Sequence, residues 1–185
     1  KFDWLEFDGK FDLDQILLAA ADKKMIYIQR SRGYTLRRSL TAADIDRVIG
    51  EIRAKFPEII VFVDNCYGEF VCESEPKADL LAGSLIKNAG GGLCPCGGYL
   101  AGKRELIGAC ADRLFAQGIG REVGATLFQN RGLFMGLFMA PHATAEALKT
   151  AVFAAALFDE LDFGTDPAYD AERADIVQLL KLGNP

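Results

Sequence analysis

The stretch "EIIVFVDN", residues 58–65, decides the fold, because five consecutive apolar residues end abruptly on an aspartate. A continuous apolar run of this length is typical of a strand covered on both faces, as in a parallel sheet. A carboxylate at the end of such a strand is costly unless a cation or several donors meet it. Asp64 is therefore expected either to cap the turn that follows or to meet a cationic partner at the sheet edge.

Strands and helices alternate around this stretch. The predicted elements are a helix from near Asp12, a strand over 25–29, a helix from Thr41 (with Asp44 in its first turn) to about Phe56, and short strands over 78–83 and 97–102. This alternation predicts an α/β fold, with a mostly parallel sheet and helices on both faces. Ligands are then expected at the carboxyl ends of the strands.

The second half of the chain is predicted to be mainly helical. A long apolar region over 123–161 is expected to be interrupted at Pro141 and to be buried or packed against a partner subunit. Its most apolar part, 133–140, is too short to span a bilayer. The only histidine, His142, is expected to start a helix and not to act as a base.

Composition narrows the class of protein. The chain has 185 residues, half of them hydrophobic, and a net charge of −5, which indicates a globular chain with an ample core. The acidic balance argues against binding to nucleic acids or to anionic membranes. The first ten residues do not resemble a signal peptide, and five cysteines without framework spacing favour reduced thiols in the cytoplasm.

Three motifs imitate known sites. "GGYLAGKR" has the glycine spacing of a phosphate loop, but Arg104 stands where a magnesium-binding hydroxyl belongs, and the segment has the pattern of a strand. "GIGREVG" (118–124) follows a helix and is expected to be a turn between helices. Cys94 and Cys96 are expected to be small thiols in a tight loop, and no metal site is predicted.

"LLAGSLIKNAGGG", residues 80–92, places Lys87 between a buried strand and a glycine-rich loop. An ordinary surface lysine is one interpretation. The other is chemical, because Lys87 follows Asp64 by 23 residues and lies at the same sheet edge if the two strands are parallel. A lysine, a buried aspartate and the Ser84 hydroxyl together describe a pyridoxal phosphate site.

In that site Lys87 would form a Schiff base with the cofactor aldehyde. Asp64 would keep the pyridine nitrogen protonated, and Ser84 would bind the phosphate. For Lys87 to act as a nucleophile we expect a lowered pKa, produced by burial near other cations.

Five blocks carry a resemblance to a known family. "QRSRGY", "FVDNCYGEF", "AGSLIKNAGGG", "GGYLAG" and "GLFMAPHATAEALKTAVFAAALF" follow one another between about residues 25 and 160. They resemble the aluminium-resistance proteins, a branch described as cystathionine beta-lyase-like or methionine gamma-lyase-like among the fold-type I pyridoxal phosphate enzymes. The resemblance implies the large domain of that fold, the same roles for Lys87, Asp64 and Ser84, and a homodimer or homotetramer.

The resemblance also implies what differs or is missing. The wider lyase group has threonine where Ile86 stands, so one phosphate contact would come from elsewhere. Residues 1–160 would be the central part of the large domain and 161–185 the start of a truncated small domain. The ring-stacking aromatic and the carboxylate-binding arginine would lie outside this chain. Arg30 and Arg32 could contact an anion, although loop arginines are more often solvated.

The implied function is that of a carbon–sulfur lyase. It would act on a sulfur-containing amino acid by β- or γ-elimination, with the Lys87 amine moving protons. Two alternatives stay open at this point. One is another reaction on the same cofactor, transamination or racemisation, and the other is a non-catalytic, truncated dimerisation domain.

Overall fold

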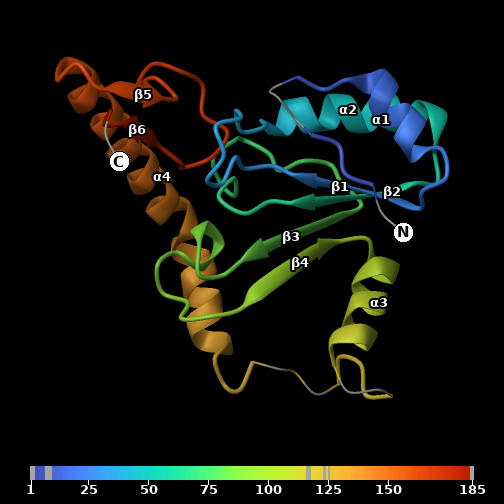
Figure 1. Cartoon of the computed structure of the whole chain (residues 1–185). Coiled ribbons are helices and arrows are strands. Elements are labelled where there is room, and N and C mark those ends of the chain that lie inside the picture. The colour runs from blue at the N-terminus through green and yellow to red at the C-terminus, as the bar shows by residue number, and fades with distance from the viewer. Residues whose placement is uncertain (1–2, 7–9, 116–117, 123, 125, 184–185) are drawn as a thin grey trace.

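The computed structural model describes residues 3–6, 10–115, 118–122, 124 and 126–183. Figure 1 shows its elements, which in chain order are α1 (Leu13–Ala20), β1 (Met25–Gln29), α2 (Ala42–Lys55), β2 (Ile60–Asp64), β3 (Leu80–Ser84), the short 3-10 helix η1 (Asn88–Gly90), β4 (Gly98–Gly102), α3 (Arg104–Leu114), α4 (Asn130–Glu160), β5 (Gly164–Asp166) and β6 (Leu179–Lys181).

The main sheet has four strands in the order β1-β2-β3-β4. β1, β2 and β3 are parallel, with Gln29 opposite Asp64 and Asp64 opposite Ala82, whereas β4 runs antiparallel to β3. The carboxyl ends of the three parallel strands point toward α4 (Figure 1). The predicted fold class, a mostly parallel α/β sheet, is therefore confirmed.

The hydrophobic core forms where α2 packs on β1 and β2. α2 begins with a capping box, in which the Thr41 hydroxyl accepts a hydrogen bond from the backbone of Asp44 and the Asp44 carboxylate accepts one from Thr41. The apolar side of α2 then meets the inward-facing residues of the strands, and the buried set is Ala20, Ile28, Leu40, Ile45, Val48, Ile49, Ile52, Ile59, Val61 and Val63. In Figure 1, α1 and α2 lie above β1 and β2, α3 lies below β4, and α4 runs along the side of the sheet at the carboxyl ends of the parallel strands.

The long helix α4 corrects one expectation. It runs without a break over 31 residues and contains Pro141, so the predicted interruption at this proline is wrong. Proline removes a single backbone donor, and the remaining bonds of a helix rich in alanine, leucine and methionine hold it together. His142 accordingly lies within the helix, exposed, and does not start one. Among the described residues, no helix is long and apolar enough to cross a membrane.

The segment after α4 returns to the carboxyl end of β1. β5 and β6 pair antiparallel in a sheet of their own. The Asp166 carboxylate lies 2.8 Å from the guanidinium of Arg32, and the buried Asp175 carboxylate accepts a 2.5 Å hydrogen bond from Ser31 and another from Ser39. A separate unit starting at residue 161 stays a prediction, but this segment contacts the loop that follows β1.

Candidate functional site

Asp64 is the last residue of β2 and makes two different contacts. One carboxylate oxygen accepts a 3.1 Å hydrogen bond from the backbone N–H of Cys66, which caps the turn after the strand. The other accepts a 3.0 Å bond from the Tyr27 hydroxyl on β1. Burial, and then the charge of Asp64, raises the pKa of Tyr27 to about 12, so this hydroxyl stays a donor. The turn-capping role of Asp64 thus holds for one of its oxygens.

Ser84 and Lys87 lie at the same edge of the sheet as Asp64. β3 runs parallel to β2 and ends at Ser84, and the backbone N–H of Lys87 donates to the Ser84 carbonyl at 3.2 Å. The Lys87 ammonium lies 4.2 Å from the centre of the Tyr67 ring. Within the described part of the chain the Ser84 hydroxyl has no hydrogen-bond partner. The structure therefore brings the three sequence-predicted residues together.

Lys87 does not have the lowered pKa that its proposed role led us to expect. Partial burial lowers the pKa of the ammonium, but Cys66, Tyr67 and Asp64 act in the opposite direction and leave it above the ordinary value. Its described neighbours are acidic or aromatic groups and not cations, so the expected cause is missing. That expectation is wrong for the described chain.

Cys66 is a member of this cluster to which the sequence analysis gave no role. Burial, followed by interaction with Asp64, raises the pKa of its thiol to about 11, while the Lys87 charge acts in the other direction. The side chain therefore stays a neutral thiol at neutral pH, in contact with both charged residues. The only sequence feature that could have indicated a role for Cys66 is its position two residues after Asp64, at the end of the strand.

The loop that carries Lys87 is fastened to the loop after Asp64. The Asn88 side-chain amide donates to the carbonyls of Tyr67 and Glu69, at 3.0 and 3.1 Å. Gly91 has a φ of 57°, a left-handed conformation that glycine adopts without strain. The two loops therefore form one unit, and the position of Lys87 depends on both.

A buried carboxyl group lies beneath this unit. Glu69 is 2% exposed, and one of its oxygens accepts a 3.0 Å hydrogen bond from the Tyr99 hydroxyl on β4. The other oxygen has no partner among the described residues. A Cβ atom on Gly83 would lie 2.3 Å from the bonded Glu69 oxygen. That glycine near the end of a strand was the sequence signal for a close approach, although it did not reveal the partner.

Glu69 gives the first testable expectation. Burial raises its pKa from 4.5 to about 7, so between these values the folded protein keeps a proton that the unfolded chain releases. Stability should therefore fall as the pH rises from 4.5 through 7, by about 3 kcal/mol from this group. Glu69→Gln should remove that part of the pH dependence, as measured by urea unfolding at several pH values.

The control for this expectation is Glu146→Gln on α4. The Glu146 side chain is exposed and pairs with Lys149 at 2.7 Å. That variant should keep the slope of the wild-type protein between pH 4.5 and 7. If Glu69→Gln and wild type lose stability in parallel over this range, Glu69 does not hold a proton in the folded protein.

The two loop arginines are neither solvated nor available to an anion, which corrects both alternatives weighed for them. Arg30 is fully buried and donates to Asn65 at 2.8 Å and to Glu75 at 2.7 Å. Arg32 is 3% exposed and binds Asp166. A run of basic residues in a loop gave no sign of these carboxylate partners, which are 45 and 134 residues away in sequence.

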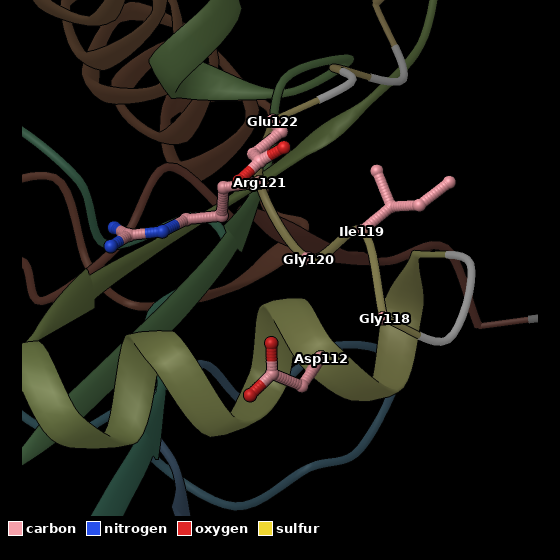
Figure 2. A pocket seen from close by; sticks show the side chains of 6 residues that line it. All are labelled: Asp112, Gly118, Ile119, Gly120, Arg121 and Glu122. Atoms are coloured by element: carbon pink, nitrogen blue, oxygen red, sulfur yellow. The ribbon is translucent and has the colours of Figure 1, made fainter.

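The remaining motifs lie away from this edge. The segment over 98–102 is strand β4, and Lys103 pairs with Asp79 at 2.9 Å, which confirms the strand interpretation of "GGYLAGKR". Cys94 is buried while Cys96 is exposed. A hollow of about 960 Å³ lies beyond α3, lined by Asp112, Gly118, Ile119, Gly120, Arg121 and Glu122 (Figure 2). α3 follows β4, which ends beside the first residue of β3, so this hollow is at the opposite edge.

Comparison with known protein families identifies the family of the chain. The family model described as methionine gamma-lyase matches residues 3–185, nearly the whole chain. The chain belongs to this family. The resemblance to aluminium-resistance proteins is thereby confirmed.

Relatives and solved structures that are similar to the chain point to the same group of proteins. The uncharacterized protein YnbB of Bacillus subtilis is 47% identical over 96% of this chain and 43% of its own length. A Listeria monocytogenes structure, provisionally named a cystathionine beta-lyase involved in aluminium resistance, is 48% identical with a TM-score of 0.93, over 97% of this chain and 45% of that one. A Clostridium novyi structure named a carbon-sulfur lyase involved in aluminium resistance is 42% identical with a TM-score of 0.90, over 97% and 44%.

The chain thus spans less than half the length of these three relatives. A more distant likeness concerns the fold alone. An aspartate aminotransferase of Thermus thermophilus is 15% identical with a TM-score of 0.62, over 96% of this chain and 53% of that one. The sheet and its helices therefore share the fold of this aminotransferase over 96% of the chain.

Proposed function

We propose that this chain is the central, lysine-bearing part of a pyridoxal phosphate-dependent carbon–sulfur lyase. Its substrate would be a sulfur-containing amino acid, cleaved by β- or γ-elimination. The observation that supports this most is the meeting of Asp64, Ser84 and Lys87 at the carboxyl edge of a parallel sheet. The names of the Listeria and Clostridium relatives point to the same class of reaction.

The residues at the edge have the chemistry that this cofactor needs. Lys87 offers an amine for the aldehyde and Asp64 a carboxylate for the ring nitrogen. Ser84 offers the phosphate a hydroxyl that has no other partner among the described residues. Bound pyridoxal phosphate withdraws electrons from the substrate's α-carbon. No described metal-binding cluster competes for these groups.

Three residues of this chain have different roles in the proposed reaction. Asp64 is fixed by Tyr27 and by the Cys66 backbone, so its carboxylate is held at one place before any ligand arrives. Lys87 is the only amine in this cluster of described residues, and we assign proton transfer at the substrate carbon to its Nζ atom. Cys66 stays neutral between them and adds no competing charge.

Association is part of the proposal. α4 carries large apolar side chains that are exposed in the single chain, and the most exposed of them are Phe134, Phe138 and Phe153. Surfaces of this kind mark protein–protein contacts. We propose a homodimer or homotetramer in the cytoplasm, with residues 1–160 in the large domain and 161–185 at the start of the small one. The same surface favours the second candidate, a non-catalytic association domain.

The experiment is chemical mapping of the lysine. Protein that contains this chain is incubated with pyridoxal phosphate, reduced with borohydride and digested. We expect a visible absorption band before reduction and, after it, the cofactor mass on the peptide with Lys87. Lys87→Ala should abolish both signals, whereas Lys103→Ala, which changes an exposed lysine paired with Asp79 at the opposite edge, should leave both unchanged.

Two results would contradict the proposal. One is the absence of the band in the wild-type protein. The other is labelling that is equal in the wild type and in Lys87→Ala. Labelling of Lys87 without release of thiol from cystathionine or methionine would instead favour another reaction on the same cofactor.

A further inference from the structure

We propose that Gly136 of α4 is a positioning residue for Lys87. It acts through direct contact between the backbone of the helix and the backbone of the lysine loop. The proposal rests on the proposed function in one respect, the role of the Lys87 amine. The contact itself is a property of the chain and is testable without cofactor.

The two backbones meet without any side chain between them. A Cβ atom on Gly136 would lie 2.4 Å from the carbonyl oxygen of Gly90 and 2.5 Å from the sulfur of Cys94. From the other side, a Cβ atom on Gly91 would lie 2.3 Å from the carbonyl oxygen of Gly136 and 2.9 Å from the backbone nitrogen of Ala140. Real Cβ atoms do not approach other atoms so closely, so both positions require glycine.

The contact lies one short turn from the amine. Gly90 donates its N–H to the carbonyl of Lys87 at 3.0 Å, and its own carbonyl accepts from Cys94 at 3.3 Å. A Cβ atom on Gly90 would lie 1.6 Å from the carbonyl oxygen of Leu85, so the loop has no room to bend within itself. A shift of Gly90 away from α4 must therefore move Lys87 as well.

The helix supplies its own comparison. Gly132 lies one turn before Gly136 on α4, and a Cβ atom there would meet nothing within 4 Å. Glycine inside a helix is less favourable than alanine. Alanine at either position should therefore favour the helix, and only at Gly136 does the contact with the lysine loop oppose this gain.

The experiment compares Gly136→Ala with Gly132→Ala in the intact protein. The first readout is amide hydrogen exchange of residues 87–94 without cofactor. The second is the rate at which borohydride fixes pyridoxal phosphate on Lys87. We expect Gly136→Ala to speed exchange and to slow fixation by at least tenfold each. Gly132→Ala should match the wild type in both.

A second pair approaches the contact from the loop. Gly91→Ala and Gly92→Ala place alanine at positive φ angles of 57° and 74°, so both suffer backbone strain, but only the first pushes against α4. Gly91→Ala should reproduce the effects of Gly136→Ala, and Gly92→Ala should show only a smaller part of them. This pair decides the matter if Gly136→Ala does not fold.

Equal exchange in the two members of both pairs would overturn the positioning role. Absence of fixation in the wild type would overturn the proposed function instead. In that case the exchange data alone would still support or refute the contact.

Discussion

Replacement of Arg30 by methionine should lower the free energy of unfolding by about 3 kcal/mol, the low end of the cost of breaking a buried ion pair from one side, because the partner Glu75 is 34% exposed. The Arg30 guanidinium is fully buried and satisfies the side chains of Asn65 and Glu75, the carbonyl of Leu40 and the sulfur of Cys72. Methionine fills part of the volume but donates no hydrogen bond, so the Leu40 carbonyl and the Asn65 oxygen lose a donor, while Glu75 keeps the bond from the Asn65 amide. Urea unfolding measures the loss as a lower transition midpoint.

The matched control is Arg38→Met. Arg38 is 46% exposed and pairs with Asp44 at 2.7 Å, an arrangement worth at most about 1 kcal/mol. A loss of less than 1 kcal/mol in Arg30→Met would show that its buried partners are satisfied in another way. The loss of unfolding free energy in Arg30→Lys should lie between those of Arg30→Met and Arg38→Met, because an ammonium keeps the charge but reaches fewer of the acceptors.

The second large effect concerns Asp64. Asp64→Asn keeps the shape of the side chain and an oxygen for the Cys66 backbone N–H, and its NH2 group can donate to the Tyr27 hydroxyl oxygen, so the protein should fold with nearly unchanged stability. It removes the charge that would keep the cofactor nitrogen protonated. We therefore expect kcat for thiol release from the better of cystathionine and methionine to fall roughly 10²–10³-fold, the usual cost of losing one preorganised electrostatic group.

Tyr27→Phe tests the hydrogen bond to Asp64 separately from the charge of Asp64. It removes the hydroxyl that donates to Asp64 but leaves the carboxylate and the backbone bond from Cys66. Its kcat should fall less than tenfold, with the visible band retained. Asp64→Asn with a kcat within threefold of wild type would exclude the proposed role of this carboxylate.

Local signals explain what could be predicted from the sequence. Thr41 and Asp44 lie three residues apart within one helical turn, so the start of the helix at Thr41 was expected from these neighbours alone. The apolar run before Asp64 indicated a covered strand, and the spacing to Lys87 then required only that the next strand be parallel. These inferences need a few neighbouring residues and one rule of topology.

The rest depended on partners far away in the chain. Glu69 and Tyr99 come from different loops and strands, and no periodicity joins them. Arg30 and Arg32 have the sequence surroundings of solvated residues, yet both are buried and donate to carboxylates and carbonyls from distant parts of the chain. Pro141 was expected to break α4 because proline lacks one backbone hydrogen-bond donor. The helix continues because its other backbone hydrogen bonds are kept on both sides of the proline.

The return of the C-terminal segment to β1 has a practical consequence for anyone who divides this protein into separately expressed pieces. A cut directly after residue 160 would remove Asp166 and Asp175, which leaves the buried guanidinium of Arg32 without its counter-charge and two serine hydroxyls without their acceptor. Recombinant boundaries should therefore fall beyond Gln178, which donates to the Pro167 carbonyl and closes this segment.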